Sequence, residues 1–368
     1  MSLLPRPQIQ SLVVGVHGGV DYQELERLGL RPEDVLDFSV NSNPFGPPPG
    51  VREVMSRSVI DRYPDPEATA LCRSLASEHG IDVTNILITN GSVEAIWCAC
   101  LAYLEPGDSV LVCGPTFGEY EIASRIAGAE IIDLIASEKD GFQPDVGLIL
   151  QIVARHRPRM VFLCNPNNPT GVYLSREEIG AILSACDGGL LMLDEAYVDF
   201  VRDHWSSIDL IDRGNLLILR SMTKDFTLAG LRLGYSLAHP GIISALRRVK
   251  PPWSVNAAAQ EAGLAALNQH GFLESCLESI RRARDYLAAE FRRQGFPVVD
   301  SRANFFIAKV GDARRFRAEL LSKGCMVRDC TSFGLPEYVR VSPRRMEECE
   351  RLVREVRSLR IKDQSVKF

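Results

Sequence analysis

Seven short segments rich in Val, Ile and Leu recur through the first two thirds of the chain. Their apolar residues are consecutive rather than alternating, which is typical of strands covered on both faces. Segments with helical periodicity separate them, and one begins with Ser175 and Glu178 spaced as a capping box. The pattern therefore predicts an α/β fold with a mostly parallel seven-stranded sheet. The strand segments are 85–89, 109–114, 130–135, 159–164, 189–194, 216–220 and 233–238.

The last third of the chain has a different pattern. A helical segment over roughly 256 to 294, dense in Arg and Glu, precedes short strand candidates that alternate with a further helix. This predicts a smaller α+β domain packed on the large one. We expect an N-terminal arm over residues 1–48, a large domain over 49–260 and a small C-terminal domain over 261–368.

Composition argues against several functional classes. The 368 residues carry 42 basic and 47 acidic side chains, a net charge of −5, so nothing suggests a nucleic-acid or membrane partner. The chain lacks both a long apolar span and the apolar core of a signal peptide near its start. Several of the ten cysteines lie in apolar segments and none form a C-x-x-C pair, so we predict no metal site. We expect a soluble, reduced, cytoplasmic protein.

Side chains able to bind a ligand follow the predicted strands, at the edge where the carboxyl ends of parallel strands meet. The first strand is followed by small residues that open a helix, whose N–H groups and dipole favour an anion such as phosphate. The next strand ends bring an aromatic ring, an amide, a carboxylate with a phenol, and a lysine with an arginine. These residues are Gly91, Ser92, Val93, Phe117, Asn168, Asp194, Tyr197, Lys224 and Arg232.

Each of these residues also has an ordinary structural interpretation. Ser92 and Asp194 can cap helices, Phe117 can belong to the core, and Lys224 can be a solvated charge. Together those interpretations require unrelated coincidences at one sheet edge. Pyridoxal phosphate uses the whole set: a carboxylate at the pyridine nitrogen, an aromatic on the ring, polar groups at the ring oxygen, and a phosphate site. A lysine of lowered pKa forms the Schiff base, which predicts Lys224 as the covalent anchor.

The motifs NPNNPTG, DEAY and SMTK-x(7)-R-x-G-Y, preceded by GS-x-E, resemble those of the fold-type I pyridoxal-phosphate enzymes. Within that family they are most similar to the histidinol-phosphate aminotransferase-like branch, from about residue 17 to residue 345. The resemblance implies Lys224 as anchor, Asp194 at the pyridine nitrogen and Phe117 on the ring. It implies Asn168 and Tyr197 at the ring hydroxyl. The implied phosphate site comprises Gly91, Ser92, Ser221 and Arg232, and Val93 and Thr223 are also expected to bind the cofactor.

The resemblance has two further implications. It implies a homodimer in which Tyr63 of the RYPDPE segment reaches the phosphate of the neighbouring subunit. It also matches Arg340 of the YVRVS segment to the arginine that binds the substrate carboxylate. We therefore expect a shared active site and a small phosphorylated amino-acid substrate.

Two reactions of this branch fit the sequence: transamination of histidinol phosphate, and decarboxylation of O-phospho-L-threonine to (R)-1-amino-2-propanol O-phosphate in cobalamin biosynthesis. The His17-Gly18-Gly19 start, the LDFSVNSNP arm and an arginine four residues after Arg340 favour the decarboxylase. Ser42 also stands where the aminotransferases typically have Glu. We predict decarboxylation, with transamination as the alternative. The expected substrate-binding residues are His17, Asn43, Arg340 and Arg344.

Some alternatives remain open at this level. His17 can equally be a solvated residue of the arm, and Arg344 can belong to a surface helix. Which bond at the substrate Cα breaks depends on its orientation to the ring, which the sequence does not show. A non-catalytic pyridoxal-phosphate-binding protein is the remaining class, and the intact lysine, aspartate and phosphate set argues against it.

Overall fold

A seven-stranded sheet forms the centre of the computed structural model, which describes residues 3–10, 12, 15 and 17–365. The strand order is β2-β8-β7-β6-β5-β3-β4, and only β8 runs antiparallel to its neighbours. The predicted fold class is thereby confirmed. The strands are β2 (Ile86–Asn90), β3 (Ser109–Gly114), β4 (Glu130–Ile135), β5 (Met160–Cys164), β6 (Leu190–Asp194), β7 (Leu216–Ser221) and β8 (Leu233–Ala238).

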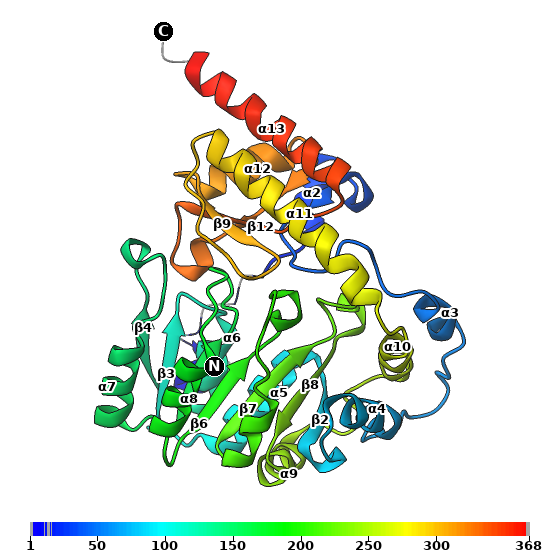
Figure 1. The fold of residues 1–368 in the computed structure, drawn as a ribbon, viewed down its shortest axis with the longest axis vertical. Coiled ribbons are helices and arrows are strands. Elements are labelled where there is room, and N and C mark those ends of the chain that lie inside the picture. Colours follow the sequence, from blue (N-terminus) through cyan, green and yellow to red (C-terminus); the bar gives the residue numbers. More distant parts are fainter. Residues whose placement is uncertain (1–2, 11, 13–14, 16, 366–368) are drawn as a thin grey trace.

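Helices cover both faces of this sheet (Figure 1). Val161 and Leu163 of β5 pack into the apolar core on one face, and Met160 and Phe162 pack into the core on the other. This two-sided burial explains why the strand segments are apolar at consecutive positions. One face carries α4 (Thr69–His79), α7 (Val146–His156), α8 (Arg176–Ala185) and α10 (Ala257–Leu267); the other carries α5 (Gly91–Tyr103), α6 (Glu119–Ala127) and α9 (Pro240–Val249).

A smaller C-terminal unit lies above the sheet in Figure 1. Its antiparallel sheet has the order β11-β12-β9. The helices α11 and α13 pack on each other and, with α12, on this sheet. The elements are α11 (Phe272–Arg293), β9 (Phe306–Lys309), α12 (Ala313–Leu321), β10 (Cys325–Met326), β11 (Arg328–Asp329), β12 (Tyr338–Val341) and α13 (Met346–Ser365).

Part of the predicted arm belongs to this C-terminal unit. The strand β1 (Leu36–Asp37) pairs in parallel with β10, and Leu25 and Val35 pack against Leu321 and Met326. Burial of these apolar side chains holds the segment on the C-terminal unit, so it is not a free arm.

The remaining helices are α1 (Pro7–Gln10), α2 (Tyr22–Leu28) and α3 (Val51–Ser56), with 3-10 helices at 32–34, 83–85, 138–140, 198–200, 208–213, 229–231 and 331–333.

The helical segment expected over 256–294 is interrupted. It forms α10, which packs on α3 and α4 of the large unit, and then α11 of the C-terminal unit. Gly271 separates them with a left-handed backbone at φ +79, a conformation that glycine adopts without strain. The predicted domain boundary after residue 260 therefore falls inside α10. The capping box predicted at Ser175 and Glu178 is present and opens α8.

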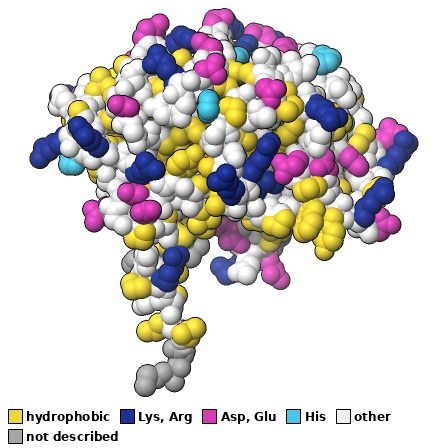
Figure 2. All heavy atoms as spheres, turned by 90° about the horizontal axis from the view of Figure 1, so that it is seen from below, with side chains coloured by type: hydrophobic (Ala, Val, Ile, Leu, Met, Phe, Trp, Pro, Cys, Tyr) yellow, Lys and Arg dark blue, Asp and Glu magenta, His cyan; other side chains and the backbone are white. Residues whose placement is uncertain are grey.

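Figure 2 shows a face on which basic and acidic side chains are interspersed rather than gathered into a patch of one sign. Within the described residues, no helix combines the length and the apolar character that crossing a membrane requires.

The loop that follows β5 contacts the C-terminal unit at Gly171, whose φ is +75. A Cβ there would lie 1.9 Å from Ser301 Oγ, so Gly171→Ala should lower the free energy of unfolding by about 2–4 kcal/mol through strain and overpacking. Gly188 is a matched control, because its φ is +81 and its Cβ would meet open space. Gly188→Ala should cost only about 1 kcal/mol. Urea denaturation measures both, and equal losses would contradict the overpacking.

Candidate active site

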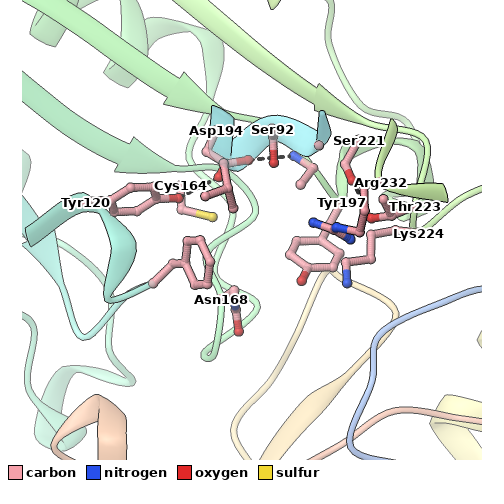
Figure 3. A pocket seen from close by; sticks show the side chains of 14 residues that line it. Ser92, Tyr120, Cys164, Asn168, Asp194, Tyr197, Ser221, Thr223, Lys224 and Arg232 are labelled. Atoms are coloured by element: carbon pink, nitrogen blue, oxygen red, sulfur yellow. Dashed lines mark hydrogen bonds between the residues drawn. The ribbon is translucent and has the colours of Figure 1, made fainter. Parts of the chain in front are cut away.

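One cavity, with a volume of about 120 Å³, lies where β5, β6 and β7 end (Figure 3). Every cofactor-binding residue expected from the sequence lines it, except Tyr63. The lining residues are Gly91, Ser92, Val93, Phe117, Tyr120, Cys164, Asn168, Asp194, Ala196, Tyr197, Ser221, Thr223, Lys224 and Arg232.

Asp194 ends β6 and is 5% exposed. Its Oδ2 accepts a hydrogen bond from the Tyr120 hydroxyl at 2.7 Å, and its Oδ1 accepts one from the Ala196 N–H at 3.0 Å. Burial raises the pKa of the Asp194 carboxyl, and these two hydrogen bonds oppose that effect. A buried carboxylate that faces a cavity suits a cationic ligand atom, such as a protonated pyridine nitrogen.

Lys224 lies on the opposite wall of the cavity in Figure 3. Burial lowers the pKa of its amine to about 8, and the cations Arg340 and Arg232 act in the same direction. The carboxylates Asp194 and Asp225 oppose this shift. Near physiological pH, an amine with this pKa has a far larger neutral fraction than an ordinary lysine, and the neutral form is the nucleophile. The site therefore fits a lysine that binds an aldehyde covalently.

The N-terminus of α5 and the turn after β7 bring together groups that could bind an anion. Glu94 accepts the N–H of Asn90 at 2.7 Å, so it does not occupy the N–H groups of the next residues. A Cβ on Gly91 would lie 2.8 Å from Arg232 Nη2, so glycine lets the guanidinium approach the start of the helix. The Ser221 and Thr223 hydroxyls are 2.7 Å apart beside it. Helix N–H groups, hydroxyls and a guanidinium are suitable ligands for phosphate.

The remaining predicted ring contacts also face the cavity. Phe117 is partly buried and packs edge-on against Tyr120, with 5.7 Å between ring centroids. Burial raises the pKa of Tyr197 to about 12, so its phenol is a neutral hydrogen-bond donor near neutral pH. Asn168 accepts a hydrogen bond from Arg340 Nη1 through Oδ1. Its amide group therefore links the cavity to Arg340.

Arg340 of β12 is 5% exposed. Its Nη2 donates to the Ser39 carbonyl at 2.7 Å, and its guanidinium lies 5.4 Å from the centre of the Phe305 ring. In the described part of the chain, no acidic side chain lies within 4.0 Å of it to form an ion pair. A buried guanidinium without a carboxylate is costly, and an anionic substrate group beside the cavity would offset that cost.

The structure gives two other predicted substrate residues partners within the protein. The Nε2 atom of His17 lies 3.1 Å from Glu119 Oε1, and its ring centroid is 5.7 Å from that of Phe117. His17 is therefore near the cavity without lining it. Asn43 is 1% exposed, and its Nδ2 donates to the Asp225 carbonyl at 3.1 Å. Its side chain supports the turn that follows Lys224 rather than facing a ligand.

Two further predicted residues lie outside the cavity lining. Arg344 donates to Glu348 Oε1 at 3.0 Å and to the Asp37 carbonyl at 3.4 Å. These contacts direct its guanidinium toward α13 and β1. Tyr63 is 76% exposed and stacks on Trp253 with ring centroids 4.5 Å apart. An exposed aromatic pair of this kind is available to a second subunit.

Sequence reasoning missed Arg328 and Tyr120. Arg328 of β11 is 7% exposed, pairs in register with Arg340 and donates to the His17 carbonyl at 2.8 Å. Burial lowers its pKa, and the charge of Arg340 adds to this effect. The sequence signal was an arginine inside a strand candidate, which is unusual for a buried position. Tyr120 follows Phe117 by three residues, the spacing of one helical turn.

The comparisons with known proteins agree with this geometry. The sequence pattern of the family "Aminotransferase class I and II" matches residues 33–356. A histidinol-phosphate aminotransferase of Halorubrum lacusprofundi is 37% identical over 320 residues, or 85% of this chain and 86% of the relative.

Two solved structures are similar to the whole fold. One is the histidinol-phosphate aminotransferase of Sinorhizobium meliloti in complex with pyridoxal-5'-phosphate, with a TM-score of 0.86 and 26% identity. The similarity covers 97% of this chain and 99% of that one. The other is the L-threonine-O-3-phosphate decarboxylase of Porphyromonas gingivalis, with a TM-score of 0.77 and 27% identity. This similarity covers 88% of this chain and 98% of the decarboxylase chain.

The pKa of Lys224 predicts how the cofactor-free protein captures pyridoxal phosphate. The rate of covalent capture should rise with pH and level off above about pH 8, because only the neutral amine attacks the aldehyde. Stopped-flow absorbance measures the rate, and borohydride reduction with peptide mapping locates the linkage. Lys224→Ala should abolish the covalent linkage. A rate still rising near the ordinary lysine pKa of about 10.4, or a reduced linkage on another lysine, would contradict the assignment.

Proposed function

Because this chain belongs to the class I and II aminotransferase family, we propose that it is a pyridoxal-phosphate-dependent aminotransferase acting on histidinol phosphate or a related phosphorylated amine. The observation that carries the proposal is that one cavity joins a buried carboxylate, a lysine of lowered pKa and an anion site. Pyridoxal phosphate is the ligand that uses all three, and its protonated ring supplies the electron sink for amino-acid chemistry.

The roles of the residues follow from their positions. Asp194 would hold the proton on the pyridine nitrogen, and Phe117 would stack on the ring face. The start of α5 and the cluster around Arg232 would hold the phosphate. Lys224 would anchor the cofactor and, once a substrate amine replaces it, would move the proton at the substrate Cα as a general base and acid.

The buried arginines would bind the anionic ends of the substrates. Arg340 and Arg328 are neighbours in the small sheet, and Arg340 reaches the cavity through Asn168. A transaminase binds two substrates in turn, here a phosphorylated amine and a dicarboxylic keto acid. The same guanidinium groups can bind either phosphate or carboxylate. Two arginines therefore suit transamination as well as they suit a substrate with two anionic ends.

Two observations favour transamination over the decarboxylation that the sequence predicts. First, the relative from Halorubrum lacusprofundi bears the name of the aminotransferase. Second, two residues expected to bind the substrate of the decarboxylase have other partners: Arg344 contacts Glu348, and Asn43 supports the turn after Lys224. Transamination, the alternative reaction of the sequence analysis, is therefore the reaction we propose.

Decarboxylation of O-phospho-L-threonine is the second candidate. The specific observation is the placement of the His17-Gly18-Gly19 segment against both buried arginines. Arg328 binds the His17 carbonyl, and a Cβ on Gly18 would lie 3.6 Å from Arg340 Nη2. The overall fold is also similar to that of the decarboxylase of Porphyromonas gingivalis.

A direct comparison of substrates tests the proposal. We expect the purified protein to form glutamate from histidinol phosphate plus 2-oxoglutarate at a rate of roughly 1–1000 per second, the usual enzymatic range. It should release no carbon dioxide from O-phospho-L-threonine. Arg340→Lys should reduce turnover, because lysine cannot reproduce a two-pronged contact with an anion. Carbon dioxide release without a keto-acid requirement, and no glutamate, would replace the proposal by the second candidate.

We also propose a homodimer with shared active sites, in which Tyr63 contacts the cofactor phosphate of the partner. Lys224→Ala and Tyr63→Ala proteins should each be impaired, and mixed dimers should contain one intact site. Unfolding and refolding an equal mixture should therefore restore about a quarter of the wild-type activity. Sedimentation velocity reports the oligomeric state. No recovery of activity in a proven mixed dimer, or a fully active monomer, would contradict the shared site.

A further inference from the structure

Tyr120 is a fully buried tyrosine at the floor of the cavity, in the first turn of α6. Its hydroxyl donates to Asp194 Oδ2 at 2.7 Å. Its ring stacks on Phe162 with centroids 4.9 Å apart and an interplanar angle of 14°. It also meets the edge of Phe117 at 5.7 Å and 82°. One side chain therefore contacts both the carboxylate and the aromatic ring that are expected to face the cofactor (Figure 3).

The hydrogen bond has one possible direction. Burial and the charge of Asp194 raise the pKa of Tyr120 well above its ordinary value, so the phenol keeps its proton. Tyr120 is therefore the donor and the Asp194 carboxylate is the acceptor. The Ala196 N–H occupies the other carboxylate oxygen at 3.0 Å. With one donor on each oxygen, the plane of the carboxylate is held in place.

The hydroxyl is not needed for packing. Phe162 and Phe117 contact the ring of Tyr120, and a phenylalanine would keep both contacts. The hydroxyl instead supplies the polar partner of a carboxylate that is 5% exposed. Removing a donor from a buried charged group is more costly than removing one from a neutral group. The effect of this tyrosine on Asp194 therefore depends on its hydroxyl group.

We propose that Tyr120 is a positioning residue, whose hydroxyl keeps the Asp194 carboxylate ionised and aimed at the pyridine nitrogen while its ring supports Phe117. This inference rests on the role of Asp194 in the proposed function. One turn of α6 then sets both the electrostatic partner and the aromatic partner of the cofactor ring. Tyr120 acts through these residues and need not touch the substrate.

The variant Tyr120→Phe tests the proposal in the intact, cofactor-loaded protein. Loss of a hydrogen bond to a buried charge should raise the dissociation constant of pyridoxal phosphate and lower kcat by about ten- to a hundredfold each. KM should change little, because no substrate contact is removed. With ¹⁵N-labelled pyridoxal phosphate, the ring-nitrogen resonance should move toward the unprotonated position. A purely structural role would lower stability and leave this resonance in place.

Tyr235→Phe is the matched control. Tyr235 is also a buried tyrosine, and its hydroxyl lies 3.0 Å from His79 Nε2, so its loss removes a buried hydrogen bond away from Asp194. We expect lower thermal stability with a cofactor dissociation constant and a nitrogen resonance equal to those of the wild type. If Tyr235→Phe shifted both quantities as Tyr120→Phe does, the effect would be a general loss of packing and the proposal would be wrong.

Two further measurements separate this inference from the proposed function. Asp194→Asn with normal turnover would reject the role of Asp194 itself. An impaired Asp194→Asn protein together with a normal nitrogen resonance and affinity in Tyr120→Phe would reject only the positioning role. A cofactor analogue with CH in place of the ring nitrogen should bind the wild type and Tyr120→Phe with similar affinity. A tenfold difference with this analogue would assign the effect to Phe117 packing and overturn the proposal.

Discussion

The parallel pairing of β5, β6 and β7 is the constraint on which the site depends. It brings Cys164, Asp194 and Ser221 to one edge, each as the last residue of its strand. Beyond Asp194, a buried ion pair of 2.8 Å between Glu195 and Arg220 joins the ends of β6 and β7. Removing one partner of such a pair typically costs about 3–5 kcal/mol. This pair thus holds together the two strands that present Asp194 and Ser221 to the cavity.

Burial shifts the pKa values of Asp194 and Lys224, the two central groups of the cavity, in opposite directions. It disfavours the charged form of each, so it raises the pKa of the Asp194 carboxyl and lowers the pKa of the Lys224 amine. Hydrogen bonds from Tyr120 and Ala196 favour the ionised form of the Asp194 carboxyl. Arg340 and Arg232 add to the effect of burial on Lys224, while Asp194 and Asp225 oppose it, and its pKa falls to about 8. An ionised carboxylate beside an amine of lowered pKa is the combination the proposed chemistry needs.

The two structural units contribute different parts of the site. The large unit supplies the anion site, the carboxylate and the lysine, and the C-terminal unit supplies the buried arginines of β11 and β12. The N-terminal segment joins them, since Ser39 binds Arg340 and Asn43 binds the turn after Lys224. The loop after β5 completes this connection, because Arg302 donates its N–H to the Gly171 carbonyl at 2.8 Å. In the proposed function, substrate recognition therefore depends on how these units are held together.

Much of the fold and the cofactor site could be predicted from the sequence, because both depend on local patterns. Consecutive apolar residues mark strands buried on two faces, and the residues that follow such strands must lie at the edge where ligands bind. Their places at or after the ends of β6 and β7 were enough to predict that Asp194, Lys224 and Arg232 lie at the cavity. The break at Gly271 was missed, because helical periodicity on both sides concealed it.

The positions of the predicted substrate-binding residues depend on the tertiary structure. Arg344 and Arg340 look alike in the sequence, but only Arg340 lies buried beside Asn168, while Arg344 contacts Glu348. The bond from Tyr120 to Asp194 joins residues 74 positions apart. The sequence by itself determined the sheet and the places of Lys224 and Asp194 at the cavity, because these follow from periodicity and strand ends. Only the tertiary structure decided which arginine contacts Asn168 at the cavity and which tyrosine binds the Asp194 carboxylate, because those contacts join distant segments whose side-chain directions no local pattern encodes.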